Sequence, residues 1–484
     1  MPHYKSYNYS QTTLIPIELE KQITPGSLEY AIHKLVEERV KIDAFEKKLK
    51  NDETGRPAYN PKVMLKIILL AYSKGIISSR KIERACKENI LFMALSCQQC
   101  PDHSKIAEFI SAMKEEIQPL FRDILLVCEE LKLLGGTSFA LDGLKLPSNA
   151  SKHWSGTHGE LKKKQEKLEE KIEKLVKTHQ LADKKERLEV EGMEVEKEEL
   201  ELDKIREKAE KIEKYLAATE PKIGKQGKEI KSNITDNESC KMSTSNGVIQ
   251  GYNGQALVDE KHQIIVHSEA FGSGQDYGHV IPMIDGAKEN IKAIGKGDNY
   301  FEGKTFTADA NYHSSENIKK CEEEKLDAYI PDVDFRKRDS RLESQKKYKE
   351  EKVERYELEE FRYDAKSDSY LCPKGKRLSR KSSRSIKEGY LQYAAKKEEC
   401  IGCEDRNKCL RMPNGIRKYL TIAMKNEDSI SKRMRDKIDT KEGRLKYERR
   451  LAIVEPVFGN IKAQKGLNRF TLRTKAKVDI QWRL

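Results

Sequence analysis

The sequence lacks a run of about 18 apolar residues, the length that a membrane-spanning helix requires, so we expect no transmembrane segment. Its first residues, Met1–Tyr7, contain no apolar core and do not resemble a secretory signal. It also lacks a glycine-rich loop of the kind that cradles nucleoside triphosphates, so nothing indicates a dependence on ATP. These absences favour a cytoplasmic protein.

The composition is polar and basic. The chain has 484 residues, enough for roughly two to four domains, with 36% charged and 37% hydrophobic residues. The net charge is +13, and the surplus is concentrated near the C-terminus, where residues 431–484 hold 16 Lys and Arg against 6 Asp and Glu. Apolar residues are interleaved with these cations, which favours a surface that binds a polyanion, most often nucleic acid, over a solvated basic tail.

Three short segments are each centred on one carboxylate. Asp142 and Asp309 each end a short apolar run that is typical of a buried strand, and Glu455 lies among apolar residues at helical spacing. A carboxylate at the end of a buried strand costs free energy unless a cation or a partner charge neutralises it. Any one of the three could be a capping or salt-bridged residue. Together, on separate elements, they provide the oxygen ligands that a pair of Mg²⁺ ions needs for phosphoryl transfer.

The order of the expected elements indicates an α/β fold. We expect strands at 251–258 and 263–271 in a hairpin, a helix at 276–293, a strand ending at Asp309, a helix at 314–324 and a strand at 326–330. With the strand of Asp142 in front and two long insertions removed, this is the order of a ribonuclease H-like core. The parallel fourth strand would lie beside the first and place Asp142 next to Asp309. The last helix would bring Glu455 across the strand ends.

The N-terminal region is expected to be helical. Helices are predicted at Ser27–Leu49, from Lys62 to a stop at Gly75, at Lys81–Cys86 and after Pro101–Ser104. Short helices joined by tight turns in a basic protein fit a helix-turn-helix-like module that binds DNA, although an ordinary helical subdomain would have the same pattern.

The charged stretch 159–222 predicts a coiled coil. Leu161, Leu168, Ile172 and Leu175 follow the spacing of a coiled-coil seam, and Gly192 indicates a break between two antiparallel helices. This insertion could serve as a dimerisation or DNA-lever arm, or it could be a solvated segment that only folds back on itself.

Four cysteines fall in the second insertion. Cys372, Cys400, Cys403 and Cys409 provide four thiolates with one two-residue spacer, which suits a structural Zn²⁺ site, and four free thiols are the alternative. Cys97–Cys100, with Cys86 and His103 nearby, is a looser candidate that a helical turn explains more simply.

We therefore divide the chain into six parts. They are an N-terminal helical DNA-binding module (1–130), the first core strand (136–158), the coiled-coil insertion (159–222), the ribonuclease H-like core (230–332), a basic Cys-rich insertion (333–440) and a C-terminal catalytic helix (441–484).

Several motifs, in order along nearly the whole chain, carry a resemblance to a known family. They are segments 55–66, 75–83 and 101–104 in the N-terminal region, then 142–143 with 148–151, 235–236, 251–255, 308–312 and 454–462. The chain resembles DDE-type transposases of bacterial insertion sequences, in the branch with a ribonuclease H-like catalytic domain, an N-terminal helical module and a Cys-bearing insertion.

The resemblance implies a transposase that binds the terminal inverted repeats of its element and target DNA. It implies that Asp142, Asp309 and Glu455 bind two Mg²⁺ ions, for which Mn²⁺ can substitute, and catalyse DNA strand cleavage and strand transfer. It further implies that Lys462 lies a turn or two along the helical face of Glu455 and holds a phosphate. Arg450 and Tyr447 would contact DNA as well. Paired DNA ends imply a homodimer or a higher oligomer on DNA, associated with the nucleoid.

Two features depart from the family pattern. Relatives carry an Arg four residues before the Glu, but here Arg450 stands five residues before Glu455 and Leu451 occupies the expected place. Pro456 could restore the geometry by kinking the helix. Relatives also continue beyond the position of Leu484. A catalytically inactive or truncated DNA-binding derivative is therefore the alternative, and a plain metal-dependent nuclease or a coiled-coil scaffold are further hypotheses.

Overall fold

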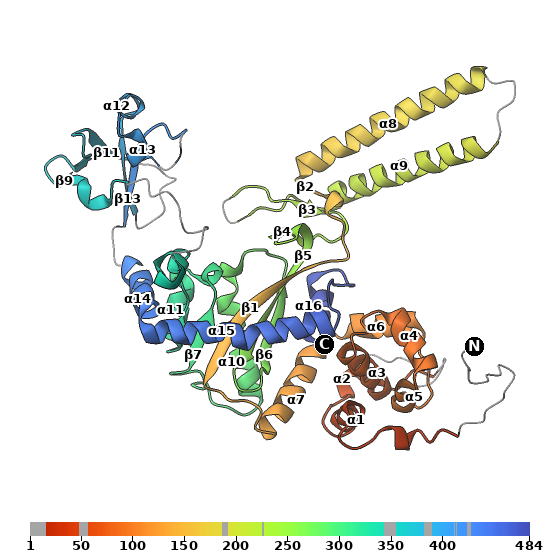
Figure 1. Cartoon of the computed structure of the whole chain (residues 1–484). Helices are drawn as coiled ribbons and strands as arrows, with labels where there is room; N and C mark the ends of the chain where they lie inside the picture. Colours follow the sequence, from red (N-terminus) through yellow and green to blue (C-terminus); the bar gives the residue numbers. More distant parts are fainter. Residues whose placement is uncertain are drawn as a thin grey trace, which may run out of the picture.

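The computed structural model describes residues 16–47, 57–185, 192–224, 227–342, 355–381, 390–410, 412, 414–423 and 427–484. Its centre is a six-stranded sheet in the order β4-β5-β1-β7-β8, with β6 also paired to β5 (Figure 1). The strands are β1 (Ser138–Pro147), β4 (Cys240–Thr244), β5 (Gly247–Asp259), β6 (Ile265–Phe271), β7 (Thr305–Ala308) and β8 (Asp327–Tyr329).

The strand directions are those that the sequence predicts. β1 and β6 each run antiparallel to β5, whereas β7 runs parallel to β1, and β8 runs parallel to β7. The helices predicted at 276–293 and 314–324 correspond to α10 (Val280–Ala293) and α11 (Ser315–Glu323). The α/β class is therefore confirmed, and the strand order is that of a ribonuclease H-like sheet.

The sheet separates two apolar layers, because successive side chains of a strand point to opposite faces. Phe139 and Leu141 of β1 pack in the layer that contains α10, whereas Ala140 packs against α15 (Lys441–Gly459) on the other face. Helix α15 contributes three buried side chains to this second layer: Ile453, Val454 and Val457. The apolar layers thus fix α15 against the strands that carry the aspartates.

The N-terminal helices have a core of their own. They are α1 (Leu28–Glu38), α2 (Asp43–Glu46), α3 (Pro61–Ser73), α4 (Ser79–Glu88), α5 (Ile90–Leu95), α6 (His103–Ala112) and α7 (Ile117–Glu130). The prediction of one continuous helix at Ser27–Leu49 is wrong, since α1 ends at Glu38 and α2 begins at Asp43, and residues 48 and 49 lie outside the described part of the chain. The chain turns there because Val40 and Phe45 are both buried in this core, which one straight helix does not allow.

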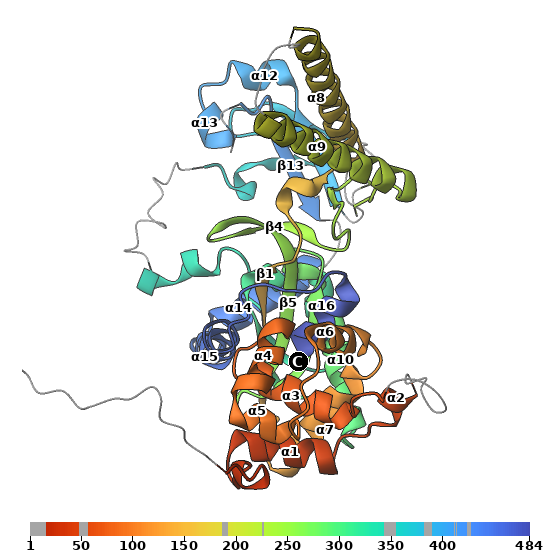
Figure 2. The same ribbon diagram turned by 90° about the vertical axis from the view of Figure 1, so that its right-hand side faces the viewer.

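The first insertion is a pair of helices. Strands β2 (Ser155–Gly156) and β3 (Ser232–Asn233) pair with each other and close its base. Helices α8 (His158–Lys185) and α9 (Gly192–Ala218) pack side by side, with Leu161 and Ile212 buried near the base. Figure 2 shows this pair on one side of the sheet and the N-terminal helices on the other.

The second insertion contains a separate five-stranded sheet in the order β13-β12-β11-β10-β9. Its strands are β9 (Arg362–Asp364), β10 (Ser369–Leu371), β11 (Arg377–Lys381), β12 (Tyr390–Ala395) and β13 (Tyr419–Ala423). Helix α14 (Glu427–Asp439) follows but packs on the main core, where Met434 is buried and the Lys437 Nζ lies 2.7 Å from Asp327. By packing, α14 belongs to the core, although the sequence places residues 333–440 in the insertion.

The described helices include none with both the length and the apolar character needed to cross a membrane.

The close approach of α16 (Lys475–Arg483) to β5 depends on a glycine. A Cβ atom at Gly254 would lie 2.7 Å from the ring of Trp482, whose Nε1 donates a hydrogen bond to the Gln255 carbonyl at 2.8 Å. We expect Gly254→Ala to displace the indole and lower the free energy of unfolding by about 1–3 kcal/mol. Denaturant titration followed by tryptophan emission measures both effects.

Gly159→Ala is the matched control. Nothing lies within 4 Å of a Cβ atom at Gly159, which stands in α8, so alanine there should be neutral or stabilising. A Gly254→Ala protein with the stability and emission of the wild type would contradict the role given to Gly254.

Candidate active site

Asp142 and Asp309 are neighbours because of the parallel pairing of β1 with β7. The last paired residues are Leu141 and Ala308, and each aspartate is the next residue of its chain segment. The prediction that Asp142 ends its strand is wrong, since β1 continues to Pro147. The strand continues because β5 still pairs with it along that length, after β7 has ended. Asp142 therefore marks the end of the parallel pairing.

The environment of the two carboxylates opposes their ionisation. Burial raises the pKa of Asp142, although the Arg450 guanidinium acts to lower it. Burial also raises the pKa of Asp309, and the charge of Asp142 raises it further. Asp309 accepts hydrogen bonds from the backbone N–H (2.8 Å) and the side-chain amide (3.2 Å) of Asn311, which orient it. Two adjacent, partly buried carboxylates of this kind favour the binding of a cation.

Arg450 is the cation that pairs with Asp142 in the described part of the chain. Its Nη1 lies 2.8 Å from Asp142 Oδ2, and its side chain is only 7% exposed. The guanidinium lies 5.7 Å from the centre of the Tyr447 ring, and the charge of Asp309 contributes to raising the pKa of Tyr447. The Arg450 Nε is buried without a hydrogen-bond partner in the described part of the chain. The structure thus places Arg450 beside Asp142 and Tyr447 beside Arg450, and the contact of both residues with DNA stays a prediction.

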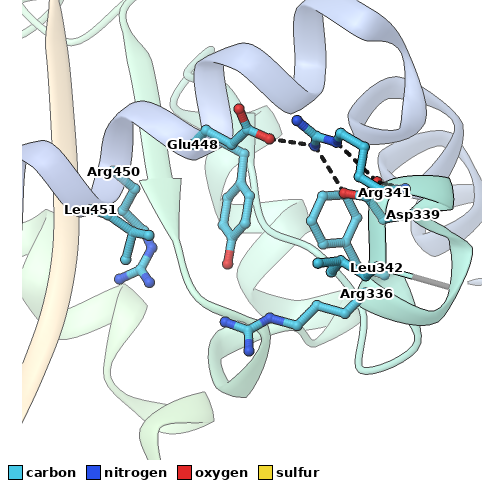
Figure 3. A pocket seen from close by; sticks show the side chains of 9 residues that line it. Arg336, Asp339, Arg341, Leu342, Glu448, Arg450 and Leu451 are labelled. Atoms are coloured by element: carbon cyan, nitrogen blue, oxygen red, sulfur yellow. Dashed lines mark hydrogen bonds and ion pairs between the residues drawn. The ribbon is translucent and has the colours of Figure 1, made fainter. Parts of the chain in front are cut away.

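A cavity of about 390 Å³ opens beside Arg450 (Figure 3). Phe335 and Tyr447 meet edge to face there, with ring centres 5.2 Å apart. Arg341 is held at its rim by ion pairs to Asp339 and Glu448. The cavity is lined by Phe335, Arg336, Asp339, Arg341, Leu342, Tyr447, Glu448, Arg450 and Leu451. The cavity walls therefore carry aromatic rings and guanidinium groups, and Arg450 connects this cavity to Asp142.

Glu455 and Lys462 are less closely tied to this site. Glu455 is exposed on α15, and among the described residues the side chains of Glu455 and Lys462 make no hydrogen bond or ion pair. The α-helix that carries Glu455 ends at Gly459, and Lys462 lies in the π-helix that follows (Asn460–Gln464), so a helical face shared by the two residues stays a prediction. The change from an i→i+4 to an i→i+5 repeat alters the direction of each later side chain.

Pro456 does not end α15, which runs through it to Gly459. A proline lacks the N–H that would bond to the carbonyl four residues earlier, here that of Ala452. The side chain of Gln263, in the turn between β5 and β6, donates to this carbonyl at 3.2 Å instead. The turn thus replaces the missing helical hydrogen bond and anchors α15 beside the sheet.

The sequence reasoning missed a group of buried polar residues behind the aspartates. Asp276 is 9% exposed, and its charge contributes to raising the pKa of both Asp142 and Asp309. Asn253 and Gln255, both fully buried, donate hydrogen bonds to it at 2.6 Å and 3.2 Å. Polar residues at alternate positions of an otherwise apolar strand are the signal that could have identified this group.

The four cysteines of the second insertion gather beside its sheet, and none forms a disulfide. Burial raises the pKa of Cys409, and the nearby Cys400, Cys372 and Cys403 raise it further. In the described residues, three metal-ligating atoms within 4.8 Å of one another occur at Glu83, Asp102 and His103 alone. The thiols are therefore close enough to interact, but their sulfur atoms are not arranged as a metal-binding group. Both predictions, a zinc site and four free thiols, are compatible with this arrangement.

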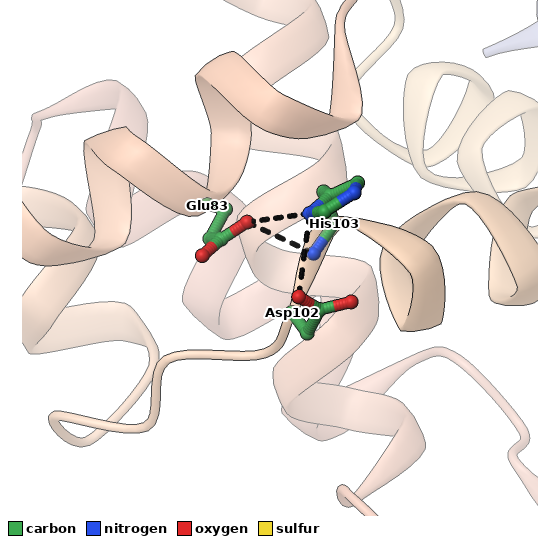
Figure 4. Close-up of side chains that lie close together, drawn as sticks. All are labelled: Glu83, Asp102 and His103. Carbon is green, nitrogen blue, oxygen red and sulfur yellow. Dashed lines mark hydrogen bonds and ion pairs between the residues drawn. The ribbon is translucent and has the colours of Figure 1, made fainter.

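The group of Glu83, Asp102 and His103 has a structural explanation (Figure 4). Glu83 of α4 accepts hydrogen bonds from the backbone N–H (3.1 Å) and Nδ1 (2.9 Å) of His103. Asp102 caps α6 by accepting from the Ser104 N–H at 2.8 Å. These contacts join α4 to α6.

The donor set at the end of the β1–β7 pairing fits a divalent cation of the Mg²⁺ type. Asp142 and Asp309 offer carboxylate oxygens, the ligands that Mg²⁺ prefers, from two rigid strands. Burial is the main cause of their raised pKa values, and the negative charge of Asp276 adds to the shift of both.

The Arg450–Asp142 pair can be tested by a double-mutant cycle. We expect Arg450→Met to lower the free energy of unfolding by about 1–3 kcal/mol at neutral pH, because a partly buried carboxylate loses its cation. Asp142→Asn in the same protein should recover most of this loss. Denaturant titration of the four proteins gives the coupling energy.

The loss should also depend on pH. The pKa of Asp142 is raised in the folded protein, so protonation favours the folded state, and removal of Arg450 raises that pKa further. The deficit of Arg450→Met should therefore shrink as the pH falls through this raised pKa. A deficit that is independent of both pH and Asp142 would show that Arg450 stabilises only by packing.

Two protein-family models match parts of the chain. The one described as "Transposase domain (DUF772)" matches residues 17–112, and the one described as "Transposase DDE domain" matches residues 371–484. No curated protein and no solved structure matches the chain. The two matches lie in the N-terminal helices and in the segment that contains Arg450 and Glu455, as the resemblance of the motifs predicts.

Proposed function

We propose that this chain, a DDE-type insertion-sequence transposase by its two domain matches and its motifs, binds the ends of its element and catalyses metal-dependent DNA cleavage and strand transfer. The observation that carries the proposal is the adjacency of Asp142 and Asp309 at the end of the β1–β7 pairing, with Arg450 beside them. A pair of carboxylates next to a buried guanidinium suits a scissile phosphate and its metal ions.

Asp142, Asp309 and Glu455 would hold two Mg²⁺ ions, with Mn²⁺ as a substitute. When bound, such ions activate the attacking oxygen and stabilise the leaving oxygen of an in-line displacement. Asp142 and Asp309 are fixed by the sheet, whereas Glu455 extends from the exposed flank of α15 and has no competing partner among the described residues. Because no described residue restrains its side chain, Glu455 would be able to turn toward the two aspartates when DNA binds.

Arg450 and Tyr447 would bind the DNA strand at this site. The Arg450 guanidinium now neutralises Asp142, and its Nε, which has no hydrogen-bond partner among the described residues, leaves a donor for a phosphate oxygen. Lys462, on the π-helix after α15, would contact a further phosphate by charge. Cation binding by Asp142 would release Arg450 for this task, because the carboxylate would then have another counter-charge.

The partners would be the terminal inverted repeats of the element and the target DNA. The basic C-terminal segment and the N-terminal helices offer surfaces for these duplexes. Since two ends must be joined, the active form would be a homodimer or a higher oligomer. The alternative is a catalytically inactive or truncated derivative, which would bind DNA through the same surfaces without cutting or joining it.

Joining of DNA tests the proposal. We expect the wild type to join a labelled, pre-cleaved end, taken from the DNA that flanks the coding sequence, to a plasmid in the presence of Mg²⁺. Asp142→Asn, Asp309→Asn and Glu455→Gln should each reduce joining to background, because each removes a metal ligand.

Asp298→Asn is the matched control, since Asp298 is 76% exposed and pairs only with Lys292 in the described part of the chain. Its joining should equal that of the wild type. Binding of the labelled end without joining by the wild type would identify a DNA-binding derivative. Cleavage without joining would identify a nuclease.

We further propose that Cys372, Cys400, Cys403 and Cys409 hold a structural Zn²⁺ ion. The mutual effect of the four thiols on Cys409 supports this, as does the turn in which the Cys403 N–H bonds to the Cys400 carbonyl at 3.5 Å. Zinc would join Cys372, which follows β10, to the segment between β12 and β13, which contains the other three cysteines.

Metal analysis decides between zinc and free thiols. We expect stoichiometric zinc in the purified chain, and its loss in Cys403→Ser, with a lower melting temperature of the insertion. Cys97→Ser, which changes an exposed thiol elsewhere, should keep the zinc. A zinc-free protein with four reactive thiols in the insertion would refute this assignment.

A further inference from the structure

Asp276 lies directly behind the candidate active site. It begins a short 3-10 helix, η3 (Asp276–Gly278), which packs against a second one, η4 (Ala310–Tyr312). Helix η4 follows Asp309 without a break, and Asp309 is its N-cap. Asp276 therefore sits on the element that supports the turn carrying the second aspartate.

A chain of hydrogen bonds connects Asp276 to that turn. Its Oδ1 accepts from Asn253 Nδ2 at 2.6 Å and from Gln255 Nε2 at 3.2 Å. The Gln255 side-chain carbonyl in turn accepts from the hydroxyl of Tyr312, which is fully buried three residues after Asp309. Asn317 strengthens the link by donating to the backbone carbonyls of Tyr277 and Tyr312, both at 2.7 Å.

The strand that carries Asp142 makes room for the same group. A Cβ atom at Gly143 would lie 2.1 Å from Gln255 Nε2 and 2.7 Å from Asn253 Oδ1. Gly143 follows Asp142 and is paired with Gln255 across the sheet. The backbone next to each aspartate thus contacts the group formed by Asp276, Asn253 and Gln255.

The charges nearby do not balance. Asp276 contributes to raising the pKa of Asp142, Asp309 and Tyr312, so the three carboxylates are close enough to repel one another. Lys145 Nζ lies 3.7 Å from Asp276 Oδ2, and Arg450 pairs with Asp142. In the described part of the chain these two cations face three carboxylates, which leaves a net negative charge at the site.

We propose that Asp276 is a positioning residue for the Asp142–Asp309 pair, which holds the turn of Asp309 through Gln255 and Tyr312 and strengthens divalent-cation binding by its charge. The proposal rests on the proposed function, in which Asp142 and Asp309 hold the cation. Outer residues of this kind orient ligands and tune affinity without touching the metal. Lys145 has the opposite effect, because its positive charge partly cancels that of Asp276.

Two substitutions separate charge from structure. Asp276→Asn removes the charge but keeps an Oδ1 that can accept from both Asn253 and Gln255. Lys145→Gln removes the compensating cation, whose side chain is 27% exposed. If Asp276 acts by its charge, the first should weaken cation binding and the second should strengthen it. If the role of Asp276 is purely structural, the two substitutions should not change cation binding in opposite directions.

The measurement is Mn²⁺ binding to the full chain by calorimetry, without DNA, with Asp142→Asn as reference. We expect about tenfold weaker binding for Asp276→Asn and severalfold tighter binding for Lys145→Gln. Circular dichroism and thermal melting verify that each variant is folded. If Asp276→Asn does not fold, Lys145→Gln alone decides: tighter binding supports the proposal, and unchanged or weaker binding overturns it.

The outcomes also distinguish this proposal from the proposed function. If Asp142→Asn abolishes Mn²⁺ binding while Asp276→Asn and Lys145→Gln bind like the wild type, the metal site stands and the role of Asp276 is refuted. If Asp142→Asn binds Mn²⁺ as tightly as the wild type, the metal site itself is refuted, together with the role of Asp276.

Discussion

The parallel pairing of β1 with β7 is the constraint on which the rest of this structure depends. It ends at Leu141 and Ala308, so the next residue of each segment is an aspartate and the two carboxylates lie side by side. Burial and mutual repulsion make that arrangement unfavourable for the protein alone. Arg450 reduces this unfavourable free energy by pairing with Asp142 on one face of the sheet. On the other face, the hydrogen bonds around Asp276 keep the backbone of both aspartates in place.

The surrounding packing holds these polar groups in place. Helix α15 carries Arg450 to Asp142 because its apolar side chains fill the layer against β1 and β5. Gln263 repairs the hydrogen bond that Pro456 cannot make, so the helix stays continuous at the point where it crosses the sheet. Helix α16 closes the other end through Trp482, which requires Gly254. A rigid frame thus surrounds a pair of charges that only a cation would fully neutralise.

The sequence predicts the strand order and the proximity of Asp142 and Asp309, since apolar runs, turn signals and the rule for parallel crossovers are local or general. It also identifies Arg450 and Tyr447, but through resemblance. Asp276 is missed because its partners, Asn253 and Gln255, are brought to it by tertiary structure. The π-helix that contains Lys462 and the packing of α14 on the core are likewise set by contacts distant in the sequence.

The central claim is that the two aspartates and Glu455 form one cation site. Anomalous diffraction from crystals of the chain soaked in Mn²⁺, with a DNA end bound, tests it most directly. The account predicts manganese peaks between the carboxylates of Asp142 and Asp309, with the Glu455 carboxylate turned toward them and Arg450 moved to a phosphate. Manganese found only elsewhere, for example at Glu83, Asp102 and His103, with Arg450 still paired to Asp142, would contradict it.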